Sequence, residues 1–395
     1  MGPRHVRALD GLRGLAVLGV MASHLFPGNA RGILAPIGAI FSYGATGVDL
    51  FFVLSGFLIT GILLDSLDDT GYFRKFYARR ALRIFPLYYG VLFVCFVLTP
   101  WLETHWGYVK WVYLFYLQNT DIAGQHEFFK VSEGVSLNHF WSLAIEEQFY
   151  LVWPMAVFFI RQRSALLKTC IVMSCVAFCL RLYLGLQGTR YIAINSGTVC
   201  RMDALLIGAA LAILVHGEYR EEVLRSARKL FLITVMALSA LALLRPIVEK
   251  HSSWIFAYDA SSLSLSYTLK ALGAAALIAW CLQESSLPRT LFENRSLRFF
   301  GKYSYGLYVL HFVALAFLLS TFRGWIRVIT PNNKGLEVAG AGLLSFLVAV
   351  VVAYVSYNYY EKPFLRLKKY FDYDHAVLVE GAAVPSEPRR DAVGT

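Results

Sequence analysis

The sequence is poor in charge. Of its 395 residues only 16% are Asp, Glu, Lys or Arg, while 57% are hydrophobic. Soluble domains carry about 25% charged residues, so this composition excludes an ordinary soluble protein. Cysteine is also scarce and none of the six shows the C-x-x-C spacing of zinc sites, which excludes a disulfide framework and predicts no metal centre. The sequence has no internal repeat, and no serine lies in a nucleophile-elbow pattern.

What the sequence does have is long apolar runs. Runs of about 18 or more residues predict transmembrane helices. The fold class is therefore expected to be all-α, a polytopic membrane helix bundle of about ten transmembrane helices. An aromatic stretch, Trp106 to Asn119, is too short to span and is expected to be a re-entrant or interfacial segment. The ten expected spans are 8–26, 46–64, 81–99, 139–160, 165–187, 197–216, 228–246, 262–282, 301–320 and 337–358.

The formal net charge of +11 taken alone would suggest a nucleic-acid partner, but the positions of the charges along the sequence do not support one. Lys and Arg gather in alternate loops, as the positive-inside rule requires, so no nucleic-acid partner is expected and both termini are predicted to be cytoplasmic. We expect residues 1–370 to form one membrane domain that contacts lipid. Residues 371–395 are expected to be a disordered cytoplasmic tail, because that segment is short and polar.

The first apolar run carries two side chains that are costly inside a membrane, Arg13 near its start and His24 near its end. Eleven residues separate them, which is about 16 Å along a helix and nearly three turns. The two side chains should thus lie on nearly one face, with the histidine in the outer half of the membrane. In the alternative explanation, the arginine at the helix end extends its charged group to the membrane surface, and the histidine is packed in the core with a hydrogen bond.

Further charged residues are predicted at a similar depth to His24, and we expect them to line a common outer cavity. Glu146 and Glu147 are about 100° apart on their helix, so one is expected to orient His24 or to accept a hydroxyl proton. The other is expected to pair with Arg181 or Arg201, and a purely structural ion pair is an equal alternative. The set comprises Asp49, Glu146, Glu147, Arg181, Arg201 and Asp203.

A second polar cluster is predicted at the cytoplasmic face. Arg80 and Arg83 share a helical face at the start of the third expected span, and Arg83 lies inside the apolar run. Arginine forks suit phosphates, so these residues together with Arg13 and the neighbouring Asp10 are a candidate site for a phosphate-rich cosubstrate. The candidate base His24 lies about three helical turns above Arg13, so a cosubstrate whose phosphates bind the arginines must have a long, thin arm to reach it. The pantetheine of an acyl-coenzyme A has that shape. We therefore expect one passage, with arginines at its cytoplasmic mouth and His24 near its far end.

These stretches resemble acyltransferase family 3, the integral-membrane acyltransferases that modify sugars and other hydroxyl acceptors. The resemblance covers about residues 7–368. It is carried by the Arg13-X10-His24 pair, GVDLFFVLSGFLIT, the Arg80-X-X-Arg83 pair, FWSLAIEEQFYLVWP, Arg201-Met202-Asp203, YSYGLYVLH and YNYYEKPF. It implies ten transmembrane helices in a bacterial inner membrane and an acyl-coenzyme A cosubstrate, with no permanently bound cofactor. It also implies a polysaccharide, a glycosylated acceptor or a macrolide-like metabolite as acceptor. Some members carry a fused hydrolase-like domain of the SGNH type, and we expect the stand-alone form.

The expected reaction is acetyl transfer from acetyl-coenzyme A to a hydroxyl group, with His24 as general base and Glu146 or Glu147 supporting the imidazole. Asp49 completes the candidate catalytic set, and Arg13, Arg80, Arg83 and Asp10 form the candidate donor-binding set. Direct transfer is preferred to a covalent acyl-enzyme, which the sequence does not exclude. His311 is assigned a packed, hydrogen-bonded place. The competing functional class is a proton-coupled transporter or glycan flippase. The sequence has no inverted repeats, which argues against that class.

Overall fold

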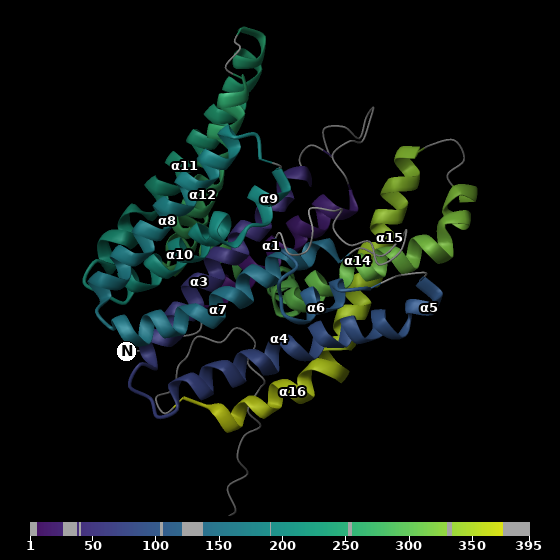
Figure 1. Cartoon of the computed structure of the whole chain (residues 1–395), viewed down its shortest axis with the longest axis horizontal. Coiled ribbons are helices and arrows are strands. Elements are labelled where there is room, and N and C mark those ends of the chain that lie inside the picture. The colour runs from purple at the N-terminus through teal and green to yellow at the C-terminus, as the bar shows by residue number, and fades with distance from the viewer. Residues whose placement is uncertain are drawn as a thin grey trace, which may run out of the picture.

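The computed structural model describes residues 6–26, 38, 41–102, 106–120, 137–189, 191–251, 255–329 and 334–373. Within these ranges every regular element is helical, which confirms the all-α fold (Figure 1). The elements are α1 (Arg7–Leu25), η2 (Tyr43–Thr46), α3 (Gly47–Asp65), α4 (Tyr72–Val97), α5 (Thr99–Leu102), α6 (Val109–Leu114), η4 (Asn138–Phe140), α7 (Trp141–Ile160), α8 (Arg163–Leu186), α9 (Tyr191–Ser196), α10 (Thr198–Val215), α11 (Arg220–His251), α12 (Ile255–Leu282), α13 (Leu287–Phe292), α14 (Arg295–Ile329), α15 (Lys334–Val355), η5 (Ser356–Glu361), α16 (Lys362–Arg366) and η6 (Leu367–Phe371).

Eight helical segments of the described chain are long and apolar enough to cross a membrane. They are Tyr43–Asp65, Tyr72–Val97, Asn138–Ile160, Arg163–Leu186, Ala193–Val215, Arg220–Lys250, Ile255–Leu282 and Ala339–Phe371. The two remaining expected spans, 8–26 and 301–320, lie in α1 and α14, which are helical and carry more charge at their first turns. The bundle therefore has the polytopic organisation that the apolar runs predict.

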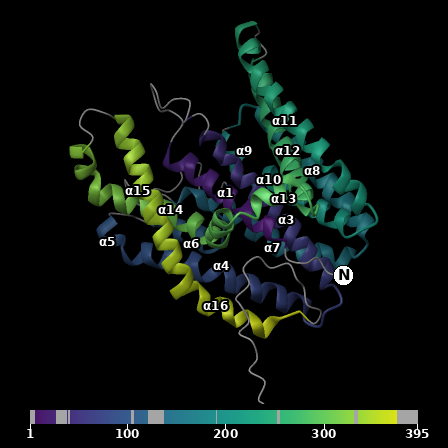
Figure 2. The ribbon, with the colours of Figure 1, turned by 180° about the vertical axis from the view of Figure 1, so that it is seen from behind.

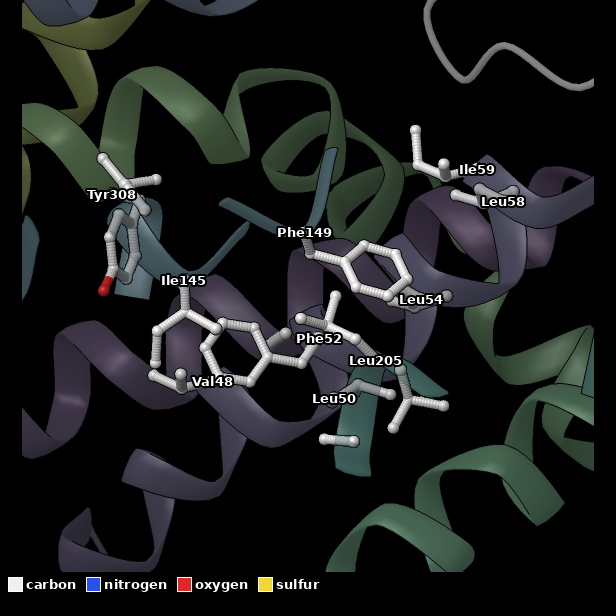
Figure 3. Close-up of a cluster of buried hydrophobic side chains, with 14 of the residues drawn as sticks. Val48, Leu50, Phe52, Leu54, Leu58, Ile59, Ile145, Phe149, Leu205 and Tyr308 are labelled. Carbon is white, nitrogen blue, oxygen red and sulfur yellow. The ribbon is translucent and has the colours of Figure 1, made fainter. Parts of the chain in front are cut away.

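Helix α3 lies at the centre of the bundle. Its apolar side chains are buried on nearly all sides, as expected for a helix that is hydrophobic all round. Figure 3 shows this core, in which α3 side chains such as Phe52 and Leu54 meet Ile145 and Phe149 of α7 and Leu205 of α10. The site described below is built on the faces of α3, α4 and α7 that converge next to this core.

Two pairs of helices approach each other closely at glycines. A Cβ atom on Gly14 of α1 would collide with the backbone carbonyl oxygen of Leu297 on α14, and one on Gly56 of α3 would collide with that of Leu205 on α10. Small residues allow this approach, which membrane helices use because lipid tails give no hydrophobic drive for association. These contacts set α1 firmly against α14 and α3 against α10.

Helix α4 begins at Tyr72, earlier than the predicted start at 81, so its arginines lie inside the helix and not at its entrance. The C-terminal segment α16–η6 runs beside α4 (Figure 1). Arg79 Nη1 donates to Asp372 Oδ1 at 2.6 Å, and this bond ties the segment to the start of α4. The predicted disordered tail, 371–395, falls from residue 374 onward outside the described residues.

The aromatic stretch forms the six-residue helix α6, which is too short to span a membrane. Tyr88 and Tyr89 of α4 donate hydroxyl hydrogen bonds to its carbonyl oxygens at 2.7 and 3.0 Å. On the other side of the bundle, α11 and α12 form a hairpin whose far end projects beyond the other helices in both views (Figures 1 and 2). Most apolar side chains of α11 are exposed, as lipid-facing side chains are.

Candidate functional site

A cavity lies between α1, α3, α4, α7 and α14. Its polar lining gathers residues from five segments that are distant in sequence, and apolar side chains of α3 complete its wall. The polar residues are Arg13, Ser55, Arg80, Arg83, Ser142, Glu146, Glu147, Tyr150, Ser304, Tyr305 and Tyr308. The cavity thus joins the arginines of the predicted cytoplasmic cluster to the two glutamates that the sequence assigned to the outer cluster.

The three arginines come from two helices. Arg13 lies one turn after Asp10 on α1, and Arg80 and Arg83 are three residues apart on α4, so their side chains share a face. None of the three guanidinium groups forms an ion pair or a hydrogen bond with a described residue. The nearest packing of Arg80 is over the rings of Phe76 and Tyr150, at 5.9 and 6.0 Å from the ring centroids. Three half-buried cations facing one cavity constitute a strong attraction for an anion.

The two glutamates occupy adjacent positions on α7 and both line the cavity. Glu146 Oε1 accepts a hydrogen bond from Ser55 Oγ at 2.7 Å, and Tyr150 donates to the same serine oxygen at 3.0 Å. Glu147 forms no hydrogen bond with the described residues. The expected pairing of one glutamate with Arg181 or Arg201 is wrong, because other carboxylates hold those two arginines.

His24 lies in a cluster of three histidines. Its Nδ1 is 2.9 Å from Nε2 of His311 on α14, and the two ring planes are within 6° of parallel with centroids 5.2 Å apart. The ring of His139, from η4, lies 4.8 Å from that of His311. His311 and His139 are buried, whereas His24 remains partly exposed. The neighbour of His24 Nδ1 is therefore the imidazole of His311. The sequence predicted Glu146 or Glu147 in that place.

Tyr308 separates the cavity from the histidine cluster. Its ring lines the cavity and lies 5.9 Å from that of His311, while its hydroxyl donates to the His139 carbonyl oxygen at 2.8 Å. Ser142 Oγ contacts the same hydroxyl. The sequence predicted one open passage from the arginines to His24. In the structure Tyr308 lines the cavity and packs beside His311, whereas neither His24 nor His311 lines it.

Two buried ion pairs account for the remaining charges of the predicted outer cluster. Arg201 Nη2 contacts Asp49 Oδ1 at 2.6 Å and stacks over the ring of Tyr267, 3.9 Å from its centroid. Arg181 Nη2 contacts Asp203 Oδ2 at 2.7 Å. The expected common cavity is therefore divided: the glutamates face the arginine cavity, while these pairs join α3, α8 and α10 away from it.

The Asp49–Arg201 pair yields a test of its role. Asp49→Asn leaves Arg201 buried without a counter-charge, which typically costs about 3–5 kcal/mol of stability. We expect the melting temperature of the detergent-solubilised protein to fall, and activity per folded molecule to change little. Thermal unfolding of Asp49→Asn beside the wild type is the measurement. A variant with an unchanged melting temperature and no activity would instead place Asp49 in the chemistry.

Sequence reasoning missed four contributors to this region: Ser55, Tyr150, Tyr308 and His139. Ser55 and Tyr150 lie within the two motifs already singled out, GVDLFFVLSGFLIT and FWSLAIEEQFYLVWP, but uncharged hydroxyls in apolar runs give no energetic signal of their own. Tyr308 precedes His311 by three residues in YSYGLYVLH, which places both on one face of α14. His139 carried a signal that could have been used, because it is a titratable residue at the start of the expected span 139–160.

Comparisons with known proteins agree with the predicted class. A family model described as an acyltransferase domain matches residues 6–357. O-acetyltransferase OatA of Staphylococcus aureus strain NCTC 8325 / PS 47 is 29% identical over 412 residues, which cover 97% of this chain and 62% of the relative. OatA of strain MRSA252 is 28% identical with the same coverage. The chain thus spans less than two thirds of the length of these relatives. No solved structure matches it.

Proposed function

From the premise that the chain belongs to this acyltransferase family and is an integral membrane protein, we propose that it moves an acyl group from cytoplasmic acyl-coenzyme A to a hydroxyl group of a sugar-containing acceptor. Acetyl is the proposed acyl group, since the relatives OatA are named O-acetyltransferases. The acceptor is proposed to be a polysaccharide or another glycosylated molecule, with a macrolide-like metabolite as the alternative within the family. The proposed location is a bacterial inner membrane, with both termini in the cytoplasm.

The observation that supports the donor assignment is the set of three guanidinium groups around one cavity, none of which forms an ion pair with a carboxylate of the described residues. A partly buried cation without a hydrogen-bonded ion pair is costly, so an anion that enters the cavity stabilises these arginines. Arginine binds phosphate oxygens through two parallel hydrogen bonds, and a coenzyme A molecule supplies several such groups. Asp10, one turn before Arg13, is proposed to act on that arginine through its charge, without a direct ion pair.

The acyl end of the donor is proposed to leave the arginines and extend toward His24. Tyr308 lines the cavity beside His311, and His24 does not line it, so the pantetheine arm is proposed to displace the Tyr308 ring to bring its thioester to the imidazole. Because His24 is partly exposed, the acceptor is proposed to reach it from the side opposite to the cavity. This arrangement holds donor and acceptor on two sides of one base.

The proposed chemistry is direct transfer. His24 removes the hydroxyl proton while the acceptor oxygen bonds to the thioester carbonyl carbon, and the carbon–sulfur bond then breaks. The thiolate of coenzyme A leaves and takes the proton from the imidazolium, so that an ester and a free thiol are the products. Glu146 and Glu147 are proposed to tune the charge of the donor cavity, since they face the arginines.

The proposal is tested with membranes that contain the protein, acetyl-coenzyme A labelled in its acetyl group, and a cell-envelope glycan fraction. We expect free thiol to be released, and label to enter the glycan, only when both donor and glycan are present. Membranes without the protein are the control. Movement of glycan across the membrane without thiol release would instead favour a transporter or flippase.

A further inference from the structure

The contacts of His311 define which of its nitrogens carries hydrogen. Its Nδ1 lies 2.7 Å from the carbonyl oxygen of Tyr308 and 3.1 Å from that of Leu307. A carbonyl oxygen only accepts hydrogen bonds, so Nδ1 of His311 must be the donor. His311 is 0% exposed, and no carboxylate of the described chain forms an ion pair with it, so an imidazolium there would be costly. A neutral His311 with hydrogen on Nδ1 has an unprotonated Nε2.

That unprotonated Nε2 faces Nδ1 of His24 at 2.9 Å. Since an acceptor nitrogen needs a donor opposite it, Nδ1 of His24 must carry hydrogen, and Nε2 of His24 is then the nitrogen with a free lone pair. The hydrogen bonds run from the α14 backbone carbonyls through His311 to His24. The first of them fixes the tautomer of His311, which in turn fixes that of His24. The base that the proposed reaction needs is thus prepared by a residue 287 positions away in sequence.

We propose that His311 is the positioning residue that holds His24 in the tautomer with a basic Nε2. This inference rests on the proposed function. It assigns to His311 the support of the His24 imidazole, which a carboxylate was expected to provide. The burial of the two rings agrees with the division of roles, because the supporting ring is enclosed and the reacting ring is the accessible one. In hydrolytic triads a carboxylate does this work, and here a neutral imidazole anchored on two backbone carbonyls does it.

During transfer His24 accepts the hydroxyl proton at Nε2 and becomes an imidazolium. Its Nδ1–H continues to donate to His311, and a bond from a charged donor is stronger than one from a neutral donor. The His311 contact therefore stabilises the charged intermediate more than the resting base. The proton returns from Nε2 to the leaving thiolate, so His311 gains and loses none.

The competing explanation is that His311 merely fills space among the rings of His24, His139 and Phe312. Two substitutions of similar size separate the two roles. His311→Gln places an amide oxygen near the former Nε2, where it can accept from His24 Nδ1–H. His311→Leu fills the volume and accepts nothing. A packing role predicts that leucine is tolerated at least as well as glutamine, and the positioning role predicts the reverse.

The experiment measures kcat for thiol release and KM for acetyl-coenzyme A in wild type, His311→Gln, His311→Leu and His24→Ala, each in intact membranes at equal folded amount. Loss of an orienting partner costs about 10–10⁴-fold in related systems, so we expect kcat of His311→Leu to fall about 10²-fold with KM unchanged. His311→Gln should stay within about tenfold of wild type. Size-exclusion profiles of the solubilised proteins establish that each variant is folded.

Two results would overturn the inference, and they are distinguishable. If His24→Ala is inactive while His311→Leu works as well as His311→Gln, His311 is a packing residue and the proposed base stands. If His24→Ala retains turnover, the assignment of the base fails and that of His311 fails with it. Should His311→Leu not fold, an inactive but folded His311→Gln would equally contradict the positioning role.

Discussion

Replacement of His24 by alanine is expected to abolish acyl transfer while leaving the protein folded and membrane-inserted. Side-chain general bases contribute about 10²–10⁴-fold to rate, and loss of the imidazole should lower kcat by that factor. Binding of the donor should not change, because His24 is not among the residues that line the arginine cavity. Label transfer from acetyl-coenzyme A and a separate donor-binding titration measure the two effects.

A matched control is His216→Ala. His216 follows α10 and its Nε2 lies 3.7 Å from Asp65 Oδ1, so it is another titratable histidine at the end of a membrane helix and outside the cavity. We expect its replacement to leave kcat and KM near wild type. Retained turnover in His24→Ala, or equal loss in both variants, would remove His24 from the mechanism.

The fold could be predicted from the sequence to a large extent because hydropathy alone decides where a helix can cross a membrane. The run from Gly47 to Asp65 is apolar on all faces, and it is the central buried helix. The start of α4 was placed too late, because the charged residues from Arg74 to Arg83 lower the hydropathy of a segment that is nevertheless helical. Which helices pack against each other was less predictable. Gly14 and Gly56 mark positions of close approach, but the sequence does not show which helix approaches each glycine.

The polar site was predictable in its residue types and less so in its pairings. Arg13, Arg83 and the two glutamates stood out because unpaired charge in an apolar run is costly. Depth estimated from helix rise then put the glutamates at the level of Asp49 and Arg201. It could not show that α7 turns them toward Arg80, because the rotation of a helix about its axis is set by packing with its neighbours. The contact between His24 and His311 joins α1 to α14 and had no local signature for the same reason.

The largest effect on donor recognition is expected from Arg80→Ala combined with Arg83→Ala. Hydrogen bonds to charged groups contribute about 1.5–3 kcal/mol each, so losing both guanidinium groups should weaken binding of coenzyme A by about 10²-fold or more. Arg83→Lys should have an intermediate effect, since an ammonium keeps the charge and loses the two-pronged geometry. Isothermal titration of the solubilised protein with coenzyme A measures the dissociation constants.

The phosphate assignment can be separated from a general loss of function by a donor that lacks phosphates. S-acetyl-pantetheine presents the same thioester and arm to the bundle without the anionic end. We expect the double variant to use it as well as wild type does, while acetyl-coenzyme A loses its advantage over it. Arg74→Ala is the matched control, because Arg74 is an exposed arginine of the same helix and is absent from the cavity lining. Unchanged affinity of the double variant for coenzyme A would refute the assignment, and an equal loss with both donors would move these arginines from phosphate binding to the folding of α4.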